Sequence, residues 1–308
     1  MTTETAILPR RGARARGGAV AHRVVPVATI VLIALVAWYA LAVVLNAPQI
    51  RDQAVRDNRS VSFGELVQAS WAMERPVLPA PHQIAANFYQ TVFEIPVSSK
   101  RSLVYHAGVT VSATLLGFLL GTVLGIALAI GIVHLRVLDR SLLPWVIASQ
   151  TIPILAIAPM IVVVLGNIGL EGVLPKAIIS MYLCFFPVTI GMVKGLRSPD
   201  PLQLDLMRTY SATQAQLFAK LRWPSSVDFL FASLKVAIAT SLVGAIVGEL
   251  PTGAQAGLGA RLLSGSYYGQ TVQIWSALVM ASLVGVVLVF AVELVERAVR
   301  RARGGGGA

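Results

Sequence analysis

Six long apolar runs constrain this chain of 308 residues more than any other feature of its sequence. Most of them approach or exceed the roughly 20 apolar residues that a helix needs to cross a bilayer. Backbone polar groups in lipid must be satisfied within the segment, so such runs predict helices. We therefore expect an all-α, polytopic membrane protein with six transmembrane helices. The runs are Val24–Leu45, Leu103–Val133, Leu142–Leu165, Ala177–Val193, Val236–Val247 and Ile274–Val292.

Basic residues alternate from one side of the predicted membrane to the other. They gather before the first run and after the second, fourth and last runs, whereas the loops after the third and fifth runs carry few. This positive-inside pattern predicts a multi-pass protein of the cytoplasmic (inner) membrane with both termini in the cytoplasm. The net charge of +11 therefore indicates topology, with contact to anionic membrane lipid as a smaller contribution. We expect no nucleic-acid partner.

The runs and the polar segments between them divide the chain into five parts. We expect a cytoplasmic basic arm over residues 1–23, a first transmembrane helix over 24–46, an external insert over 47–102, a five-helix core over 103–300 and a flexible tail over 301–308.

Two short amphipathic helices are predicted in the external insert. Ser60 and Ser62 are the candidate caps for a helix whose apolar residues, from Phe63 to Trp71, recur at helical spacing. A second helix is expected after Pro81. Such helices lie on the outer face of a membrane or at its interface. The alternative is a packed external subdomain that contacts no ligand.

Small residues and prolines mark the core. Gly117, Gly121 and Gly125 share one face of the second run, which predicts close packing against another helix. Prolines interrupt the third run around Gln150, Thr151 and Pro153. Broken helices often line translocation paths, so these three residues are candidates for the path. The alternative is a set of structural kinks.

Glu249 lies near the outer end of the fifth run, before a loop rich in Pro and Gly. A carboxylate at that depth is costly unless it is paired or hydrated, which makes Glu249 a candidate gate residue. The alternative is a helix-end carboxylate at the boundary between lipid and water.

The cytoplasmic segment between the fourth and fifth runs carries the strongest local signals. Ser198–Pro201 is typical of a helix start, since proline fits the first turn and Asp200 suits the positive end of the helix dipole. Ser211–Gln214 matches a capping box and predicts a second helix that begins at Ser211 and is stopped by Pro224. Residues 198–228 should therefore form a helix–turn–helix with one apolar face.

This segment resembles the EAA loop of ABC importer permeases, whose pattern is Glu-Ala-Ala, three residues, Gly, and then Phe-x-Lys and Leu-Pro. Phe218, Lys220 and Pro224 match the pattern, and Ala212 follows the position of the loop glycine. The sequence departs from it at Asp205-Leu-Met, where Glu-Ala-Ala is usual, and at Ser211, which stands in place of the glycine.

The resemblance covers most of residues 77–300 and points to the nitrate/sulfonate/taurine-type branch of these permeases. That branch also serves thiamine-pyrimidine precursors and riboflavin, so the substrate stays open. The insert around residues 47–76 is not typical of the branch. The stretches that carry the resemblance outside the loop include Leu78–Pro81, Gln150–Pro159, Gly195–Asp200, Gly248-Glu249 and Gly257–Gly259.

The resemblance implies an assembly of two permease subunits, two cytoplasmic ABC ATPase subunits and an external solute-binding protein. The divergent loop favours a non-identical second permease. The chain lacks a G-x-x-x-x-G-K-[ST] phosphate loop, so we expect no enzymatic activity and no cofactor here, with ATP and Mg bound by the partner ATPase. The expected coupling residues are Asp205, Arg208, Ser211, Ala212, Ala215, Phe218, Lys220 and Pro224.

Phe218 has two interpretations at this stage. It is expected to be a buried anchor in a groove of the ATPase, and the alternative is that it packs against the ends of the chain's own spans.

Other classes of protein fit the sequence less well. The four histidines are scattered, so no metal site is expected, and Cys184 is the only cysteine. No constellation for a membrane-embedded hydrolase can be assembled. A secondary carrier or a channel without an ATPase partner remains the alternative, although carriers usually place ionisable residues in the middle of the membrane.

Overall fold

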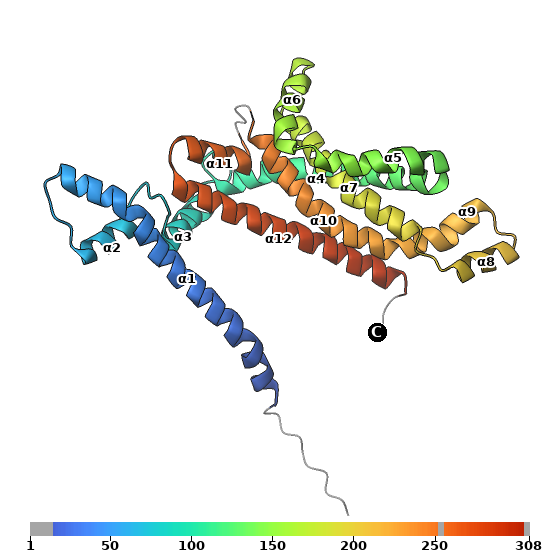
Figure 1. The fold of residues 1–308 in the computed structure, drawn as a ribbon, viewed down its shortest axis with the longest axis horizontal. Coiled ribbons are helices and arrows are strands. Elements are labelled where there is room, and N and C mark those ends of the chain that lie inside the picture. The colour runs from blue at the N-terminus through green and yellow to red at the C-terminus, as the bar shows by residue number, and fades with distance from the viewer. Residues whose placement is uncertain (1–14, 252–255, 305–308) are drawn as a thin grey trace, which may run out of the picture. The chain divides into compact units, whose positions relative to one another are not determined.

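The computed structural model describes residues 15–251 and 256–304 (Figure 1). Within these ranges the chain is helical, with no strand. The α-helices are α1 (Ala15–Arg56), α2 (Phe63–Ala72), α3 (Pro81–Tyr89), α4 (Leu103–His134), α5 (Arg136–Ala148), α6 (Ile154–Asn167), α7 (Val173–Leu196), α8 (Pro201–Thr209), α9 (Gln214–Leu217), α10 (Trp223–Glu249), α11 (Leu258–Tyr267) and α12 (Thr271–Ala302). Short π turns follow α3 and α9, and one 3₁₀ turn, Ser149–Thr151, separates α5 from α6.

The chain divides into two compact units, residues 1–84 and residues 85–308. In the first unit, α1 continues through Pro48 to Arg56, ten residues beyond the expected first span. Its part Val25–Arg56 has a mean hydropathy of 2.6 over its most apolar window, as a membrane helix requires. The predicted cap at Ser62 is confirmed, because Ser62 and Glu65 form a capping box at the start of α2.

Asn46 organises the polypeptide that follows α2. Its side chain is fully buried, its Nδ2 donates to the carbonyls of Ser70 and Leu78 at 3.3 and 3.0 Å, and its Oδ1 accepts the N–H of Val77 at 2.8 Å. A buried amide with partners on both ends holds irregular backbone that has no helical hydrogen bonds of its own. The segment between α2 and α3 is therefore fastened to α1.

The second unit is built around α4 and α7, which run parallel to each other. Gly121 faces Cys184 and Gly125 faces Val188, so the two helices advance together. A Cβ at Gly121 would lie 2.9 Å from the Cβ of Cys184, and one at Gly125 would lie 2.8 Å from the carbonyl oxygen of Phe185. A Cβ at Gly117 would collide with Ser180. The predicted packing role of the three glycines is thus confirmed.

Helix α10 runs antiparallel to α7, since Gly244 lies against Ser180 and Gly248 lies against Lys176. Helix α12 runs antiparallel to α10 and is joined to it by an ion pair between Lys235 and Glu296 at 2.6 Å. The long helices of this unit therefore form one bundle (Figure 1).

The predicted third span is broken. Helices α5 and α6 meet at an angle of 99° across the segment that contains Gln150, Thr151 and Pro153. Five helices among the described residues are long and apolar enough to cross a membrane, and six crossings result if the bent pair is one span. Because α4 and α7 are parallel, residues 135–172 must return the chain to the side where α4 began. We therefore interpret the pair as one broken span.

Two expected boundaries change. Helix α1 begins at Ala15, inside the expected basic arm, and α12 continues to Ala302, inside the expected tail. Residues 1–14 and 305–308 lie outside the described part of the chain.

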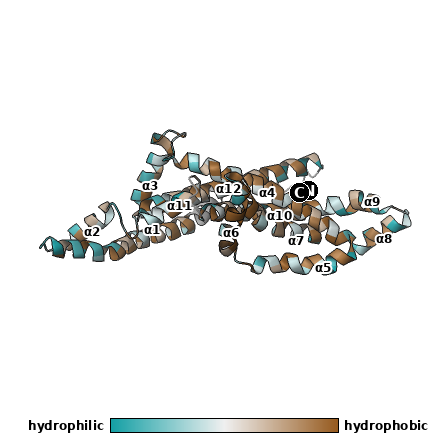
Figure 2. Ribbon diagram, turned by 90° about the horizontal axis from the view of Figure 1, so that it is seen from above, coloured by the Kyte–Doolittle hydropathy of each residue, from teal (hydrophilic) through white to brown (hydrophobic). Residues whose placement is uncertain are grey.

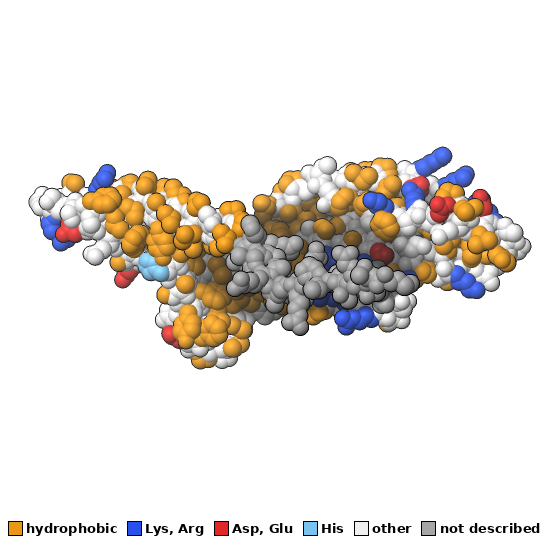
Figure 3. Space-filling model, turned by 90° about the horizontal axis from the view of Figure 1, so that it is seen from below, with side chains coloured by type: hydrophobic (Ala, Val, Ile, Leu, Met, Phe, Trp, Pro, Cys, Tyr) orange, Lys and Arg blue, Asp and Glu red, His pale blue; other side chains and the backbone are white. Residues whose placement is uncertain are grey.

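Hydrophobic residues cover α4, α10 and α12, while hydrophilic residues gather on α8 and α9 (Figure 2). In Figure 3, Lys, Arg, Asp and Glu side chains lie at the end of the second unit that carries α8 and α9. This polar end is where the sequence places the coupling loop.

Candidate functional site

Two places in the second unit concentrate the functional candidates: the loop between α7 and α10, and a buried polar cluster at the opposite ends of these helices. In the loop, α8 begins as predicted. Asp200 is its N-cap, with its side chain accepting the N–H of Leu202 at 2.8 Å, and Pro201 occupies the first turn. Gln203 reaches back to the N–H of Asp200, which completes a capping box.

The predicted start of the second loop helix at Ser211 is wrong. Ser211 has a φ of +50°, and its N–H bonds to the carbonyl of Arg208 at 2.8 Å, so it ends the turn after α8. Thr213 is the actual cap. Its Oγ1 accepts the N–H of Gln216, while the Gln216 side chain accepts the N–H of Thr213 at 2.9 Å. Helix α9 therefore begins at Gln214.

Pro224 does not stop the helix, contrary to the sequence-based prediction. A π turn over Phe218–Arg222 leads directly into α10, and Pro224 lies in the first turn of that helix. The result is a continuous helical path from Gln214 to Glu249 that joins the loop to the fifth span.

Phe218 packs on the chain's own helices. Its ring centroid lies 5.3 Å from that of His134, at the end of α4, and 6.0 Å from that of Trp223. It also contacts the buried cluster that includes Ile132 and Met192. These contacts are those of the alternative interpretation, in which Phe218 packs against the ends of the chain's own spans. Phe218 thus holds the end of α9 against the helical bundle.

The free apolar side chains of the loop lie elsewhere. Leu202, Leu206 and Tyr210 are 78%, 57% and 77% exposed. Sequence reasoning did not single them out as contact residues, although Leu206 and Tyr210 lie one helical turn apart. Of the predicted coupling residues, Asp205, Arg208, Ala215 and Lys220 are exposed and Ala212 is half-buried. Asp205 and Arg208 form a surface ion pair at 2.9 Å.

The second place is the surroundings of Glu249, whose side chain is fully buried. Its carboxylate accepts the hydroxyl of Thr110 at 3.0 Å and the backbone N–H of Gly259 at 2.8 Å, and it lies 3.9 Å from the Nζ of Lys176. The interpretation of Glu249 as a carboxylate at the boundary between lipid and water is therefore wrong. A buried charge with these partners is compensated.

Three helices and the start of α11 meet in this cluster. Lys176 of α7 donates to the carbonyl of Ala256 at 2.9 Å, and Thr110 of α4 accepts the N–H of Leu258 at 2.9 Å. His106 accepts the N–H of Gly257 at Nδ1 and donates from Nε2 to the carbonyl of Lys100, which requires a neutral imidazole with its proton on Nε2. Every backbone N–H from 257 to 259 thus has a side-chain partner.

Gly257 is required by this arrangement. Its φ of +127° disfavours any residue with a Cβ, and a Cβ at this position would collide with the carboxylate of Glu249. Sequence reasoning found Glu249 but missed His106, Thr110 and Lys176 as members of its cluster, because their partners are brought near only by the fold.

Gln150, Thr151 and Pro153 lie at the bend between α5 and α6, where all three are exposed. Tyr182 of α7 donates to the carbonyl of Ser149 and fixes the bend to the bundle. No hydrogen bond among the described residues joins these three residues to the cluster around Glu249. Among the side chains that the structure describes, in residues 25–251 and 256–304, no group of three or more His, Cys, Asp or Glu is arranged to hold a metal ion.

A comparison with known families decides the identity of this bundle. The sequence profile of the family described as "binding-protein-dependent transport system inner membrane component" matches residues 121–303, which is more than half of the chain. The chain belongs to this family. It is an ABC transporter permease.

The names of curated relatives of the permease refer to several different substrates. It is 33% identical to the riboflavin transport system permease protein RibX of Chloroflexus aurantiacus, over 72% of this chain and 78% of the relative. It is 30% identical to the formylaminopyrimidine transport permease protein ThiX of Halalkalibacterium halodurans, over 71% and 83%. It is 23% identical to the putative aliphatic sulfonates transport permease protein SsuC of Bacillus subtilis, over 77% and 82%.

Proposed function

We propose that this permease is the membrane subunit of an ATP-driven importer. It moves a small solute, delivered by an external binding protein, across the cytoplasmic membrane by alternating access. ATP and Mg are bound by cytoplasmic ABC ATPase subunits, and a second permease subunit, non-identical to this chain, completes the path.

The observation that carries this proposal is the arm formed by α8 and α9. It extends beyond the apolar bundle and exposes Leu206 and Tyr210 among charged side chains. Large apolar side chains are rarely exposed on a polar segment outside the membrane unless a partner covers them. A short helix that presents apolar residues one turn apart suits docking into a groove of the ATPase.

The packing of Phe218 supports a mechanical role for the arm. Because Phe218 fixes α9 to α4, and the helix continues from Gln214 to Glu249, a displacement of the arm is carried into two membrane helices at once. Ion pairs from Asp228 and Glu296 to Arg300, at 3.3 and 2.8 Å, add α12 to the same moving part.

The cluster around Glu249 lies at the far end of α10 and serves as the external gate in this proposal. It holds the first turn of α11 against α4 and α7 through His106, Thr110 and Lys176. A set of short polar contacts can be exchanged between two arrangements, as alternating access requires, more readily than a packed apolar core. Gln150, Thr151 and Pro153, at the broken span, line the path itself.

The names of the relatives favour a small organic solute, either a heterocycle such as a riboflavin- or pyrimidine-type compound or an anion such as a sulfonate. The binding protein selects among these in the proposed system, since the cluster around Glu249 is fully occupied by the chain's own groups.

The docking proposal is tested by replacing Tyr210 with Ala in the permease co-expressed with its ATPase. Loss of a buried aromatic anchor removes about 2 kcal/mol or more of binding, so co-purification of the ATPase and stimulated ATP turnover should fall together. Tyr267→Ala is the matched control, because Tyr267 is about as exposed as Tyr210, 80% against 77%, and lies on α11 at the other end of the bundle. Equal assembly and turnover in both variants would refute docking through α8.

A further inference from the structure

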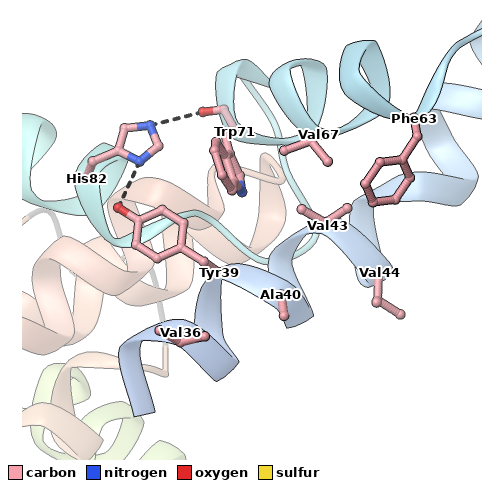
Figure 4. A pocket seen from close by; sticks show the side chains of 9 residues that line it. All are labelled: Val36, Tyr39, Ala40, Val43, Val44, Phe63, Val67, Trp71 and His82. Atoms are coloured by element: carbon pink, nitrogen blue, oxygen red, sulfur yellow. Dashed lines mark hydrogen bonds between the residues drawn. The ribbon is translucent and has the colours of Figure 1, made fainter. Parts of the chain in front are cut away.

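Two grooves in the chain differ in what they offer to a ligand. The first lies between α1 and α2, in the first unit, and is walled by apolar side chains and by the rings of Tyr39, Trp71 and His82 (Figure 4). The hydroxyl of Tyr39 and the Nδ1 of His82 form a hydrogen bond at 3.2 Å, and no Lys, Arg, Asp or Glu side chain lines this groove. It therefore holds no group that would select a charged ligand.

The second groove lies between α5 and α7 and combines apolar walls with basic side chains. Its volume is about 470 Å³. Its apolar lining includes Ile147 of α5 with Ile190 and Val193 of α7, and its basic lining residues are Lys194 and Arg197. All of the residues that line it belong to the second unit.

Two contacts fix how α5 lies against α7. Arg197, which follows the last residue of α7, pairs with Asp139 near the start of α5 at 2.8 Å. Tyr182, near the middle of α7, donates to the carbonyl of Ser149, directly after α5. The two helices are therefore antiparallel, and the basic side chains of the groove lie toward the end of α7 that leads to α8.

The groove is apolar toward the middle of the membrane. Ile147 and Ile190 fall within the apolar runs Leu142–Leu165 and Ala177–Val193. The basic lining residues follow the second of these runs, and in the topology predicted from the basic loops this end faces the cytoplasm. A ligand that fills the groove must therefore carry its charge at the cytoplasmic end and be apolar toward the centre of the bilayer.

Lys194 supplies the charge that selects such a ligand. Its Nζ lies 5.8 Å from the ring centroid of Phe229, which also lines the groove, so the ammonium is held at the groove by attraction to the ring face. Asp139 is already paired with Arg197, and among the described residues no carboxylate forms an ion pair with Lys194. The groove therefore keeps one positive charge that no acidic side chain compensates.

We propose that this groove binds an anionic phospholipid of the cytoplasmic leaflet. The phosphate of the head group lies at Lys194, and one acyl chain lies along Ile190 and Ile147. Anionic lipids are supplied by that leaflet, and basic pockets between membrane helices on the cytoplasmic side suit their head groups. The site is additional to transport of the solute, and its lipid lies between α7 and the first half of the broken span.

The first test measures lipid selectivity. The full-length permease is incubated in detergent with equal amounts of phosphatidylglycerol and phosphatidylcholine, and native mass spectrometry compares the amounts that stay bound. We expect a preference for one phosphatidylglycerol that falls about fivefold in Lys194→Gln, the change that corresponds to ~1 kcal/mol for one basic residue near an anionic surface. Lys220→Gln is the matched control, since Lys220 is exposed, lies outside the groove and faces the cytoplasm in the same topology. An equal preference in the two variants would overturn the proposal.

A second pair of variants tests whether the lipid lies in the groove. Ile147→Trp fills the groove, whereas Leu119→Trp places the same side chain on α4, outside it; Ile147 and Leu119 are 53% and 60% exposed. The bound phosphatidylglycerol should be lost with Ile147→Trp and retained with Leu119→Trp. Retention in both variants would place the lipid elsewhere and contradict the proposal. Circular dichroism of both variants checks that the helices are intact.

Inorganic phosphate separates a lipid site from a site for a soluble anion. An excess of phosphate should leave the phosphatidylglycerol bound, because the acyl chain contributes to its binding. Displacement of the lipid by phosphate alone would show that the groove takes a soluble anion, and the proposal would be wrong.

Discussion

The Oε2 atom of Glu249 accepts the backbone N–H of Gly259 at 2.8 Å, ten residues further along the chain. This bond turns the polypeptide back on itself and sets α11 against the end of α10. Thr110 and Lys176 approach the same carboxylate from α4 and α7, so one side chain joins four helices.

Glu249→Gln tests this junction. The amide keeps the size of the side chain but loses the ion pair with Lys176, and its NH₂ group cannot accept the bonds that the carboxylate oxygen accepts. We expect a loss of about 1–3 kcal/mol in stability, because buried partners are left unsatisfied. The measurement is the thermal unfolding midpoint of the purified permease in detergent.

Glu293→Gln is the control for that substitution. Glu293 pairs with Arg297 at 2.6 Å on the exposed side of α12, where an ion pair contributes about 0–1 kcal/mol. The midpoint should therefore move less with Glu293→Gln than with Glu249→Gln. Equal shifts for the two variants would contradict the role given to Glu249.

The loop between α7 and α10 shows why local sequence signals were only partly sufficient. Ser211 and Thr213 are each followed three residues later by Gln, so the sequence contains two overlapping capping boxes. The structure uses the second, because the chain needs a residue with positive φ to leave α8 and Ser211 supplies it. No rule of local spacing chooses between them.

Substitutions at these two positions distinguish the caps. Thr213→Ala removes the cap of α9 and should cost about 1 kcal/mol locally, seen as faster hydrogen exchange of the amides from 214 to 217. Ser211→Gly should leave that exchange unchanged, since glycine adopts positive φ easily. If Ser211→Gly made the exchange faster and Thr213→Ala did not change it, the capping box that begins at Ser211 would be the one that the chain uses.

The spans were the most predictable part of the fold, because their signal is the length of each apolar run. The break at Gln150 was indicated by the prolines, but its angle of 99° was not, since proline marks a weak point without fixing the path beyond it. Asn46 and His106 could not be recognised either. Their partners are backbone groups brought near only by the fold.

The direction in which Phe218 points was likewise beyond the sequence. The sequence spacing of an apolar residue on a loop helix is the same whether its side chain packs on a partner or on its own chain. The choice depends on how the end of α4 meets α9, and His134 decides it here.

The proposed topology has a direct test in single-cysteine variants that lack Cys184, which is buried. Because α4 and α7 are parallel, Ser98→Cys and Glu171→Cys should both react with an impermeant maleimide applied to whole cells. Ser211→Cys should react only after the membrane is opened. Labelling of Ser98→Cys without Glu171→Cys would mean that α5 and α6 form a re-entrant loop and not a broken span.

Uptake of solute by the reconstituted complex is the most direct test of the account. The permease is placed in proteoliposomes with its second permease subunit and its ATPase, and the loaded binding protein is added outside. The account predicts accumulation of the solute that requires ATP inside the vesicles, is independent of any ion gradient, and falls in Tyr210→Ala but not in Tyr267→Ala. Uptake driven by a proton or sodium gradient without ATP, or passive conduction by this chain alone, would contradict it and indicate a carrier or a channel.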